Sequence, residues 1–138
     1  MAETLPLRAR LACFVSNAAR RALRVLGSGG TNLPGQIALR LCPALPALLS
    51  RGMRIIAVSG TNGKTTTCRM IAAGLEAHGT AFIANRSGAN LRAGVTAELA
   101  ANVRRGRIVK RVAVLECDEA ALRKIGRASC RERVYVLV

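Results

Sequence analysis

The chain has 138 residues and 51% of them are hydrophobic, a size and composition that fit one domain and exclude a second full one. Aromatic residues make up only 2% and Trp is absent, so the core must be aliphatic. Few aromatic side chains are available to stack on nucleic-acid bases. The formal net charge of +15 favours anionic partners such as nucleotides, nucleic acid or an acidic membrane surface, although a GC-rich coding sequence would also produce many arginines.

Cysteine usage and the N-terminus point to a reducing compartment. The cysteines contain no C-x-x-C pair and no regular spacing, which argues against a zinc site or a disulfide framework; they are Cys13, Cys42, Cys68, Cys117 and Cys130. Reduced thiols in a cytosolic protein are the default for such a pattern. Glu3 and scattered arginines interrupt the apolar N-terminal stretch, so we expect neither a signal peptide nor a membrane span, and a cytoplasmic protein.

Residues 7–26 predict an amphipathic helix that ends at Gly27. Its arginines mostly lie opposite an apolar stripe at helical spacing, which comprises Leu7, Leu11, Phe14, Val15, Ala18, Ala22, Val25 and Leu26. We expect this stripe to pack on the rest of the protein. The alternative is a basic amphipathic helix that rests on an anionic membrane.

Beyond a turn-rich break at 28–32, strands and helices alternate. The predicted elements are a helix at 34–41, an interruption at Pro43 and Pro46, a strand at 53–59, a helix from Lys64 to His78 that is closed by Gly79, a strand at 80–84, a polar loop at 85–90, a helix at 91–104 and a strand at 111–117. Such alternation predicts an α/β fold, with a parallel sheet covered by helices on both faces. Residues 1–50 would form an N-terminal helical segment, and residues 51–124 the sheet domain.

The segment between the first strand and the next helix has the features of a phosphate-binding loop. Glycines let the backbone approach phosphate oxygens, successive N–H groups point inward, and the helix N-terminus adds about half a positive charge. In such loops the lysine neutralises the outer phosphates and the following hydroxyl ligates Mg²⁺, roles that fall here on Lys64 and Thr65. The predicted nucleotide-binding residues are Gly60, Thr61, Asn62, Gly63, Lys64, Thr65 and Thr66. Val58 occupies a position that is glycine in the generic pattern, so the loop is a compact variant.

Two polar segments follow the next strands at the edge of the sheet where ligands bind in open α/β folds. The loop at 85–90 suits a substrate or phosphate loop through Asn85, Ser87 and Asn90, with a plain surface turn as the alternative. The third strand ends in an acidic cluster, in which Glu116 is placed to complete a Mg²⁺ site with Thr65. Favourable negative charge at a helix N-terminus is the alternative explanation for Asp118 and Glu119.

The last fourteen residues, 125–138, are predicted to be non-native. Residues 125–134 are what ATC GGA AGA GCG TCG TGT AGG GAA AGA GTG encodes, a string that resembles a widely used sequencing adapter. We expect this tail to make few contacts with the core and to take no part in the sheet. The end at 135–138 is apolar enough to dock on an exposed strand edge, so contact by those residues alone would not decide the matter.

Four blocks in the same order carry a family resemblance: Gly29-Gly30-Thr31-Asn32-Leu33-Pro34-Gly35, Gly60-Thr61-Asn62-Gly63-Lys64-Thr65-Thr66-Thr67, Asn85-Arg86-Ser87-Gly88-Ala89-Asn90-Leu91 and Leu115-Glu116-Cys117-Asp118-Glu119-Ala120. From Gly29 to about Lys124 the chain resembles the Mur ligases, and among them the Mur-ligase-like subunits of lipid II isoglutaminyl synthases. Those subunits lack the uridine-nucleotide-binding domain that ordinary Mur ligases place before the loop, and 59 residues precede Gly60 here. Folylpolyglutamate synthases and other Mur-type amino acid ligases are the alternatives.

The resemblance implies an ATP- and Mg²⁺-dependent ligase that phosphorylates the α-carboxylate of D-glutamate in lipid II. A partner glutaminase subunit would supply ammonia to the acyl phosphate, yielding D-isoglutamine at the inner membrane face. The resemblance implies no nucleic-acid partner. Lys64 and Glu116 would be catalytic, with Thr65 and Glu116 on Mg²⁺. The family's four-cysteine zinc ribbon and C-terminal domain would lie downstream, so the sheet domain is expected to be incomplete and inactive alone. A basic nonenzymatic module that binds nucleic acid or membrane is the hypothesis from another class.

Overall fold

A computed structural model describes residues 4–27, 32–85, 91–118 and 133–137 of the chain. Its helices are α1 (Leu7–Val25), α2 (Asn32–Leu41), α3 (Leu45–Ser50), α4 (Lys64–Ala77) and α5 (Arg92–Ala101). A four-stranded sheet has the order β2-β5-β1-β6 and contains β1 (Arg54–Ser59), β2 (Phe82–Ala84), β5 (Val112–Glu116) and β6 (Arg133–Leu137). A separate antiparallel pair joins β3 (Val103–Arg104) to β4 (Arg107–Ile108).

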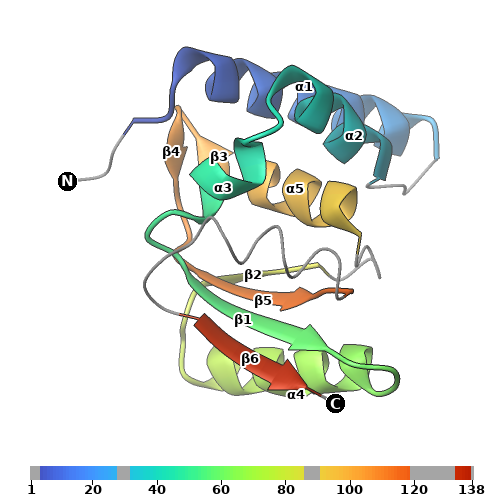
Figure 1. Cartoon of the computed structure of the whole chain (residues 1–138), viewed down its shortest axis with the longest axis vertical. Helices are drawn as coiled ribbons and strands as arrows, with labels where there is room; N and C mark the ends of the chain where they lie inside the picture. Colours follow the sequence, from blue (N-terminus) through green and yellow to red (C-terminus); the bar gives the residue numbers. More distant parts are fainter. Residues whose placement is uncertain (1–3, 28–31, 86–90, 119–132, 138) are drawn as a thin grey trace.

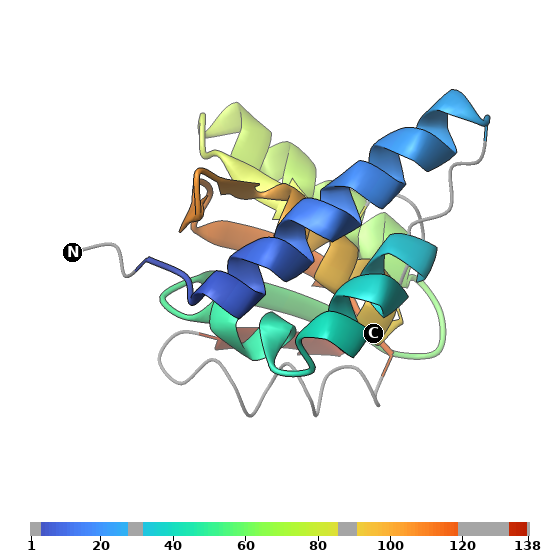
Figure 2. The same cartoon turned by 90° about the horizontal axis from the view of Figure 1, so that it is seen from above.

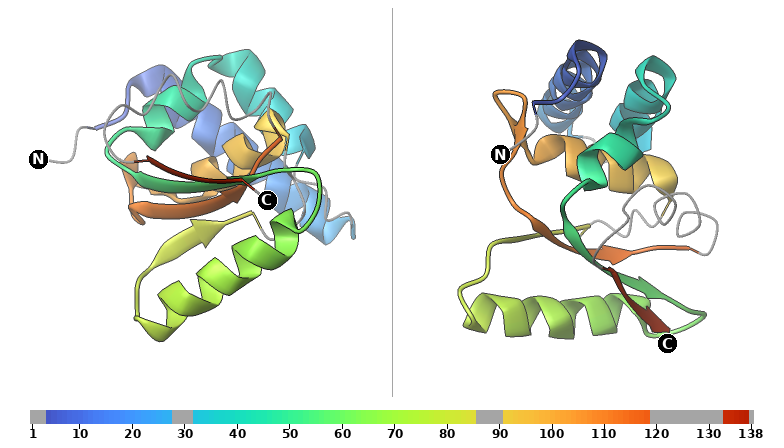
Figure 3. Two further views of the ribbon diagram at one scale, coloured as in Figure 1. Left: turned by 60° about the horizontal axis from the view of Figure 1, so that its bottom comes forward. Right: turned by 60° about the vertical axis from the view of Figure 1, so that its left-hand side comes forward.

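The sheet lies between two unequal helical layers (Figure 1). All its pairings are parallel, and α4 covers one face while α5 covers the other. Helices α1, α2 and α3 form a further layer over α5, and α1 and α2 run across the top of the molecule (Figure 2; Figure 3, right). The predicted α/β fold with helices on both faces of a parallel sheet is therefore confirmed.

Two local predictions were wrong for identifiable reasons. Pro46 does not interrupt regular structure but lies in the first turn of α3, where the missing N–H has no intrahelical partner to lose. The helix expected at 91–104 ends at Ala101 and is followed by the β3–β4 hairpin. Arg105 and Gly106 turn this hairpin with φ values of 50° and 75°, as a tight two-residue hairpin turn requires.

Helix α1 packs through its small residues rather than through the predicted apolar stripe. Its buried residues are Ala9, Ala12, Cys13 and Ser16, whereas Leu7, Leu11, Phe14, Val25 and Leu26 are exposed. Small side chains let α1 approach α2 and α5 closely. The expectation that the apolar stripe packs on the rest of the protein is therefore wrong. Among the described helices, none is long and apolar enough to cross a membrane.

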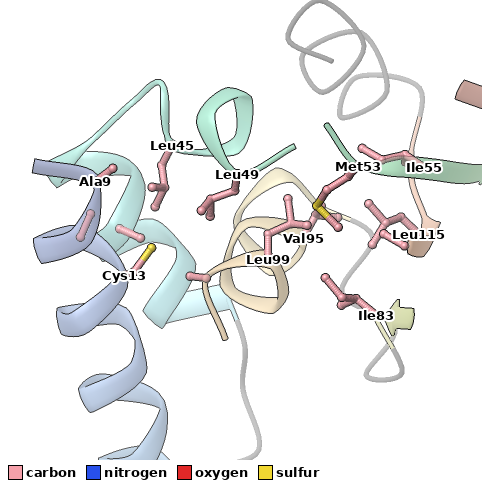
Figure 4. Packing of buried hydrophobic residues seen from close by; sticks show 14 of the residues in the cluster. Ala9, Cys13, Leu45, Leu49, Met53, Ile55, Ile83, Val95, Leu99 and Leu115 are labelled. Atoms are coloured by element: carbon pink, nitrogen blue, oxygen red, sulfur yellow. The ribbon is translucent and has the colours of Figure 1, made fainter. Parts of the chain in front are cut away.

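One aliphatic cluster ties the helical stack to the sheet (Figure 4). It runs from Ala9 of α1 through Leu45 of α3 and Leu99 of α5 to Ile55 and Leu115 on the central strands. Helix α4 contributes no buried residue to it. The stack on the α5 side therefore provides most of the packing that fixes the sheet, while α4 is attached through partly covered side chains.

Part of the tail joins the sheet. Strand β6 pairs with β1 in parallel, with Arg133 opposite Ile55 and Leu137 opposite Ser59. The expectation that residues 125–138 take no part in the sheet is wrong for 133–137, although docking of the apolar end on a strand edge was foreseen. Without β6 this side of β1 is an open edge, whose unpaired N–H and C=O groups accept any extended segment that can reach them.

Gly35 provides a test of how α2 packs on α5. A Cβ there would overlap the backbone carbonyl of Ala93, so Gly35→Ala should force the helices apart and lower the free energy of unfolding by about 1–3 kcal/mol. Gly74 of α4 is the matched control, because nothing lies within 4 Å of a Cβ added there. Gly74→Ala should stabilise by about 0.5–1 kcal/mol in the same urea titration. Equal effects at both positions would contradict the close contact.

Candidate functional site

The site lies where β1 and β5 end. The two strands are parallel neighbours, with Val58 opposite Glu116, and the Cys117 N–H donates to the Val58 carbonyl at 3.0 Å. Their carboxyl ends therefore meet at one edge of the sheet, as the sequence predicted. The loop at 60–63 follows β1 at this edge and leads directly into α4.

Two glycines give the loop its shape. Gly60 and Gly63 have φ values of 144° and 77°, which side-chain-bearing residues rarely adopt, and Gly63 is the residue that precedes the first turn of α4. Lys64 folds back over the loop, where its Nζ donates to the carbonyl of Gly60 at 2.8 Å and to that of Thr61 at 3.4 Å. The ammonium group is thus held close to the loop backbone.

The first turn of α4 contacts the acidic end of β5. The Thr65 hydroxyl donates to Oε2 of Glu116 at 2.9 Å, and Glu116 is only 7% exposed. The sequence placed these two residues in one site, and the structure brings them into direct contact. Thr61 and Asn62 are exposed in the loop, and Thr66 is exposed in the first turn of α4.

Asn85 holds the backbone of Glu116. Its Nδ2 donates to the Glu116 carbonyl at 2.7 Å, and its Oδ1 accepts the Glu116 N–H at 2.8 Å. The β2–β5 pairing reaches Ala84 opposite Val114, so the amide of Asn85 continues this pairing beyond the end of β2. Sequence reasoning missed this positioning role, for which the only signal was an Asn directly after a strand. The predicted substrate role of Asn85 stays a prediction, and Ser87 and Asn90 lie outside the described residues.

A pocket of about 310 Å³ adjoins the contact between Thr65 and Glu116. It lies between α4 and the ends of β2 and β5, and Cys68 and Arg69 are among the α4 residues that line it. The pocket thus leaves room for a small group beside the first turn of α4 and Glu116.

The thiols around this site remain protonated at neutral pH. Burial, with a smaller contribution from the negative charge of Glu116, raises the pKa of Cys68 to about 11. Burial also raises the pKa of Cys117 to about 12, aided by Asp118, Cys68 and Glu116. Because these pKa values lie well above neutral pH, both thiols are in their protonated form in the metal-free protein. Within the described ranges, no group of three or more His, Cys, Asp and Glu side chains is arranged to hold a metal ion.

Comparison with known proteins agrees with this arrangement. The family model described as the Mur ligase middle domain matches residues 58–133, which is more than half of the chain. The chain belongs to the Mur ligase family.

Three relatives carry the same name, lipid II isoglutaminyl synthase (glutamine-hydrolyzing) subunit MurT. Those of Staphylococcus aureus strains N315 and COL are each 37% identical over 120 residues, which cover 86% of this chain and 27% of the relative. The protein of Streptococcus pneumoniae strain ATCC BAA-255 / R6 is 34% identical over 119 residues, or 86% of this chain and 26% of the relative. The chain therefore spans about a quarter of the length of the curated relatives it matches.

The amide of Asn85 can be tested against a matched control. Asn102 holds the backbone of Lys110 by the same pair of hydrogen bonds, at 2.8 and 3.0 Å, but at an exposed position. Asn85→Ala leaves two buried backbone groups of Glu116 without these partners, at about 1–3 kcal/mol each, whereas water replaces the bonds lost in Asn102→Ala. Chemical denaturation should show the larger loss for Asn85→Ala. A larger loss for Asn102→Ala would contradict the positioning role.

The pKa of Cys68 reports on the charge of Glu116. A neighbouring carboxylate disfavours the thiolate, so Glu116→Gln should lower the pKa of Cys68 from its value of about 11, although burial keeps it raised. Alkylation of Cys68 by iodoacetamide at mildly alkaline pH, followed by peptide mass spectrometry, should accelerate about two- to tenfold, since one pKa unit changes the thiolate fraction about tenfold. Glu98→Gln, on α5, is the control. An unchanged alkylation rate of Cys68 in Glu116→Gln would contradict an effect of the Glu116 charge on the pKa of Cys68.

Proposed function

We propose that this chain is the ATP-binding part of an amide-forming ligase of peptidoglycan biosynthesis. ATP would phosphorylate the α-carboxylate of D-glutamate in lipid II, releasing ADP. Ammonia would then displace phosphate from the acyl phosphate and leave D-isoglutamine. Within this assignment, residues 51–124 belong to the central ATP-binding domain, residues 1–50 form the helical segment before it, and residues 125–138 are non-native.

The contact between Thr65 and Glu116 beside a glycine loop is the observation that carries the proposal. Together with the nearby Lys64 ammonium, this contact brings a hydroxyl, a carboxylate and a positive charge together where β1 and β5 end. Phosphoryl transfer needs mainly positioning and electrostatic stabilisation, which groups of this kind provide. The names of the three relatives favour this substrate over that of a folylpolyglutamate synthase.

The residues present fit a Mg²⁺–nucleotide. The first-turn amides of α4 are available to phosphate oxygens, with Lys64 as the matching full charge. Because the Thr65 hydroxyl gives its proton to Glu116, its oxygen lone pairs are free to face a cation. Thr65 and Glu116 are thus the residues that would hold Mg²⁺, which when bound neutralises phosphate charge. On nucleotide binding, Lys64 would give up its hydrogen bonds to the carbonyls of Gly60 and Thr61, and its ammonium group would contact the outer phosphates instead.

The remaining parts of the reaction belong to other chains or regions. A glutaminase subunit would release ammonia from glutamine, and the relatives' name, a subunit of a glutamine-hydrolyzing synthase, supports such a partner. The lipid-linked substrate would place the enzyme in the cytoplasm at the inner face of the membrane. A zinc ribbon, if the complete protein has one, would use cysteines other than those of this chain.

Lys64→Ala tests the loop. In the complete enzyme it should lower the rate of ATP-dependent amidation by about 10²–10³, because a donor that stabilises transition-state charge is lost. In this chain it should weaken the binding of a fluorescent ATP analogue in the presence of Mg²⁺. Lys110→Ala is the matched control, since its Nζ also donates to a backbone carbonyl, that of Phe82 at 2.8 Å, outside the loop.

Normal amidation by Lys64→Ala would show that the chemistry lies elsewhere. Salt-dependent binding of duplex DNA, unaffected by nucleotide, would instead favour the nonenzymatic module.

A further inference from the structure

Helix α1 exposes large apolar side chains in its first half and at its C-terminal end. Leu7, Phe14 and Val25 are 80%, 72% and 88% exposed, and Leu11 is also more than half exposed. At 100° per residue these residues, together with Ala18 and Ala22, fall within an arc of about 80°. We call this set the α1 stripe. Scattered exposed apolar residues are ordinary, but a continuous stripe over a helix marks an interaction surface.

The orientation of α1 is fixed by contacts on its other sides. Its buried face, from Ala9 to Ser16, lies opposite the α1 stripe on the helix circumference. Arg20 forms a two-bond ion pair with Glu98 of α5, at 2.9 and 3.2 Å, and Asn17 donates to the Ala100 carbonyl at 3.2 Å. These contacts hold the α1 stripe outward, so its exposure is built into the fold.

The charges of α1 are of one sign. The helix carries five arginines and no acidic residue. Arg10, Arg21 and Arg24 flank the α1 stripe on one side and Arg8 flanks it on the other. A second copy of this face would bring like charges together across an apolar contact, which disfavours self-association.

We propose that the α1 stripe and its arginines dock on an anionic lipid surface, with α1 lying in the plane of the interface. An apolar stripe bordered by cations matches the acyl boundary below and the phosphates beside it. Arginine side chains reach such phosphates while their stems cover apolar area. A nucleic acid would match the arginines but would leave the α1 stripe in water.

The position of α1 is compatible with a working phosphate loop. Helix α1 is in the outermost layer on the α5 side, and α4 lies beyond the opposite face of the sheet (Figures 1 and 3). Docking through α1 therefore leaves the N-terminus of α4 away from the membrane. The proposal rests on the surface of α1 alone and does not depend on the proposed ligase activity.

Vesicle co-sedimentation of the whole 138-residue chain tests this surface. The chain should bind vesicles of phosphatidylglycerol and phosphatidylcholine more tightly than phosphatidylcholine alone, and added salt should weaken binding. The double variant Phe14→Ser, Arg21→Glu should bind at least about tenfold more weakly, since it removes an inserted ring and reverses a charge near the surface. Arg69→Glu, Met70→Ser makes the same kind of change on α4, where Met70 is 71% exposed, and should bind like the unaltered chain.

Circular dichroism should show the same helix content in both double variants, because all four substituted positions are exposed. The single variant Val25→Ser, at the end of the α1 stripe, provides an independent second test and should also weaken binding. Failure to bind anionic vesicles, equal binding by the α1 and α4 variants, or a concentration-dependent dimer that only the α1 variants abolish would each overturn the proposal. Tighter binding to duplex DNA than to vesicles, lost in Arg21→Glu but not in Phe14→Ser, would overturn it in favour of nucleic acid.

Discussion

The parallel register of β1 and β5 is the constraint on which the site depends. Pairing Val58 with Glu116 places the end of one strand, the start of the glycine loop and the only buried carboxylate among the described residues at one edge. The contacts that Thr65 and Asn85 make with Glu116 follow from that alignment. Thr65 reaches Glu116 because α4 begins at the loop, and Asn85 reaches the same backbone because β2 lies on the other side of β5. A shift of one residue would turn Glu116 to the opposite face.

Local signals in the sequence were sufficient for the elements that build this edge. Nearby residues alone predict the apolar strand β1 and the glycine loop after it. They also predict that α4 ends at Gly79, which has a positive φ. The site residues Lys64, Thr65 and Glu116 could be grouped because parallel strands end together. The role of Asn85 was not predicted, since an Asn directly after a strand does not reveal which backbone groups its amide will bind. The β3–β4 hairpin was missed because strands of two residues have no detectable periodicity.

Helix α1 shows a different limit of sequence reasoning. Periodicity identified its larger apolar residues correctly, but it could not reveal that the face of Ala9, Ala12 and Cys13 packs instead. Close helix contact favours small side chains, as Gly35 of α2 also shows against Ala93. Likewise, β6 formed from a segment that was not expected to take part in the sheet. An open strand edge is permissive, because backbone groups pair with little regard to side chains.

The absence of buried residues in α4 has a consequence for dynamics. Local opening free energies follow the burial of apolar contacts, so α4 belongs to a less stable cooperative unit than the stack of α1, α2 and α5. Lys64 and Thr65 sit at the start of this unit, and a ligand held there would couple directly to its local unfolding equilibrium. Amide exchange in α4 would then slow on ligand binding while exchange in α5 stayed unchanged. The weakly packed helix α4 would thus be the part of the molecule whose local stability changes when a ligand binds the loop.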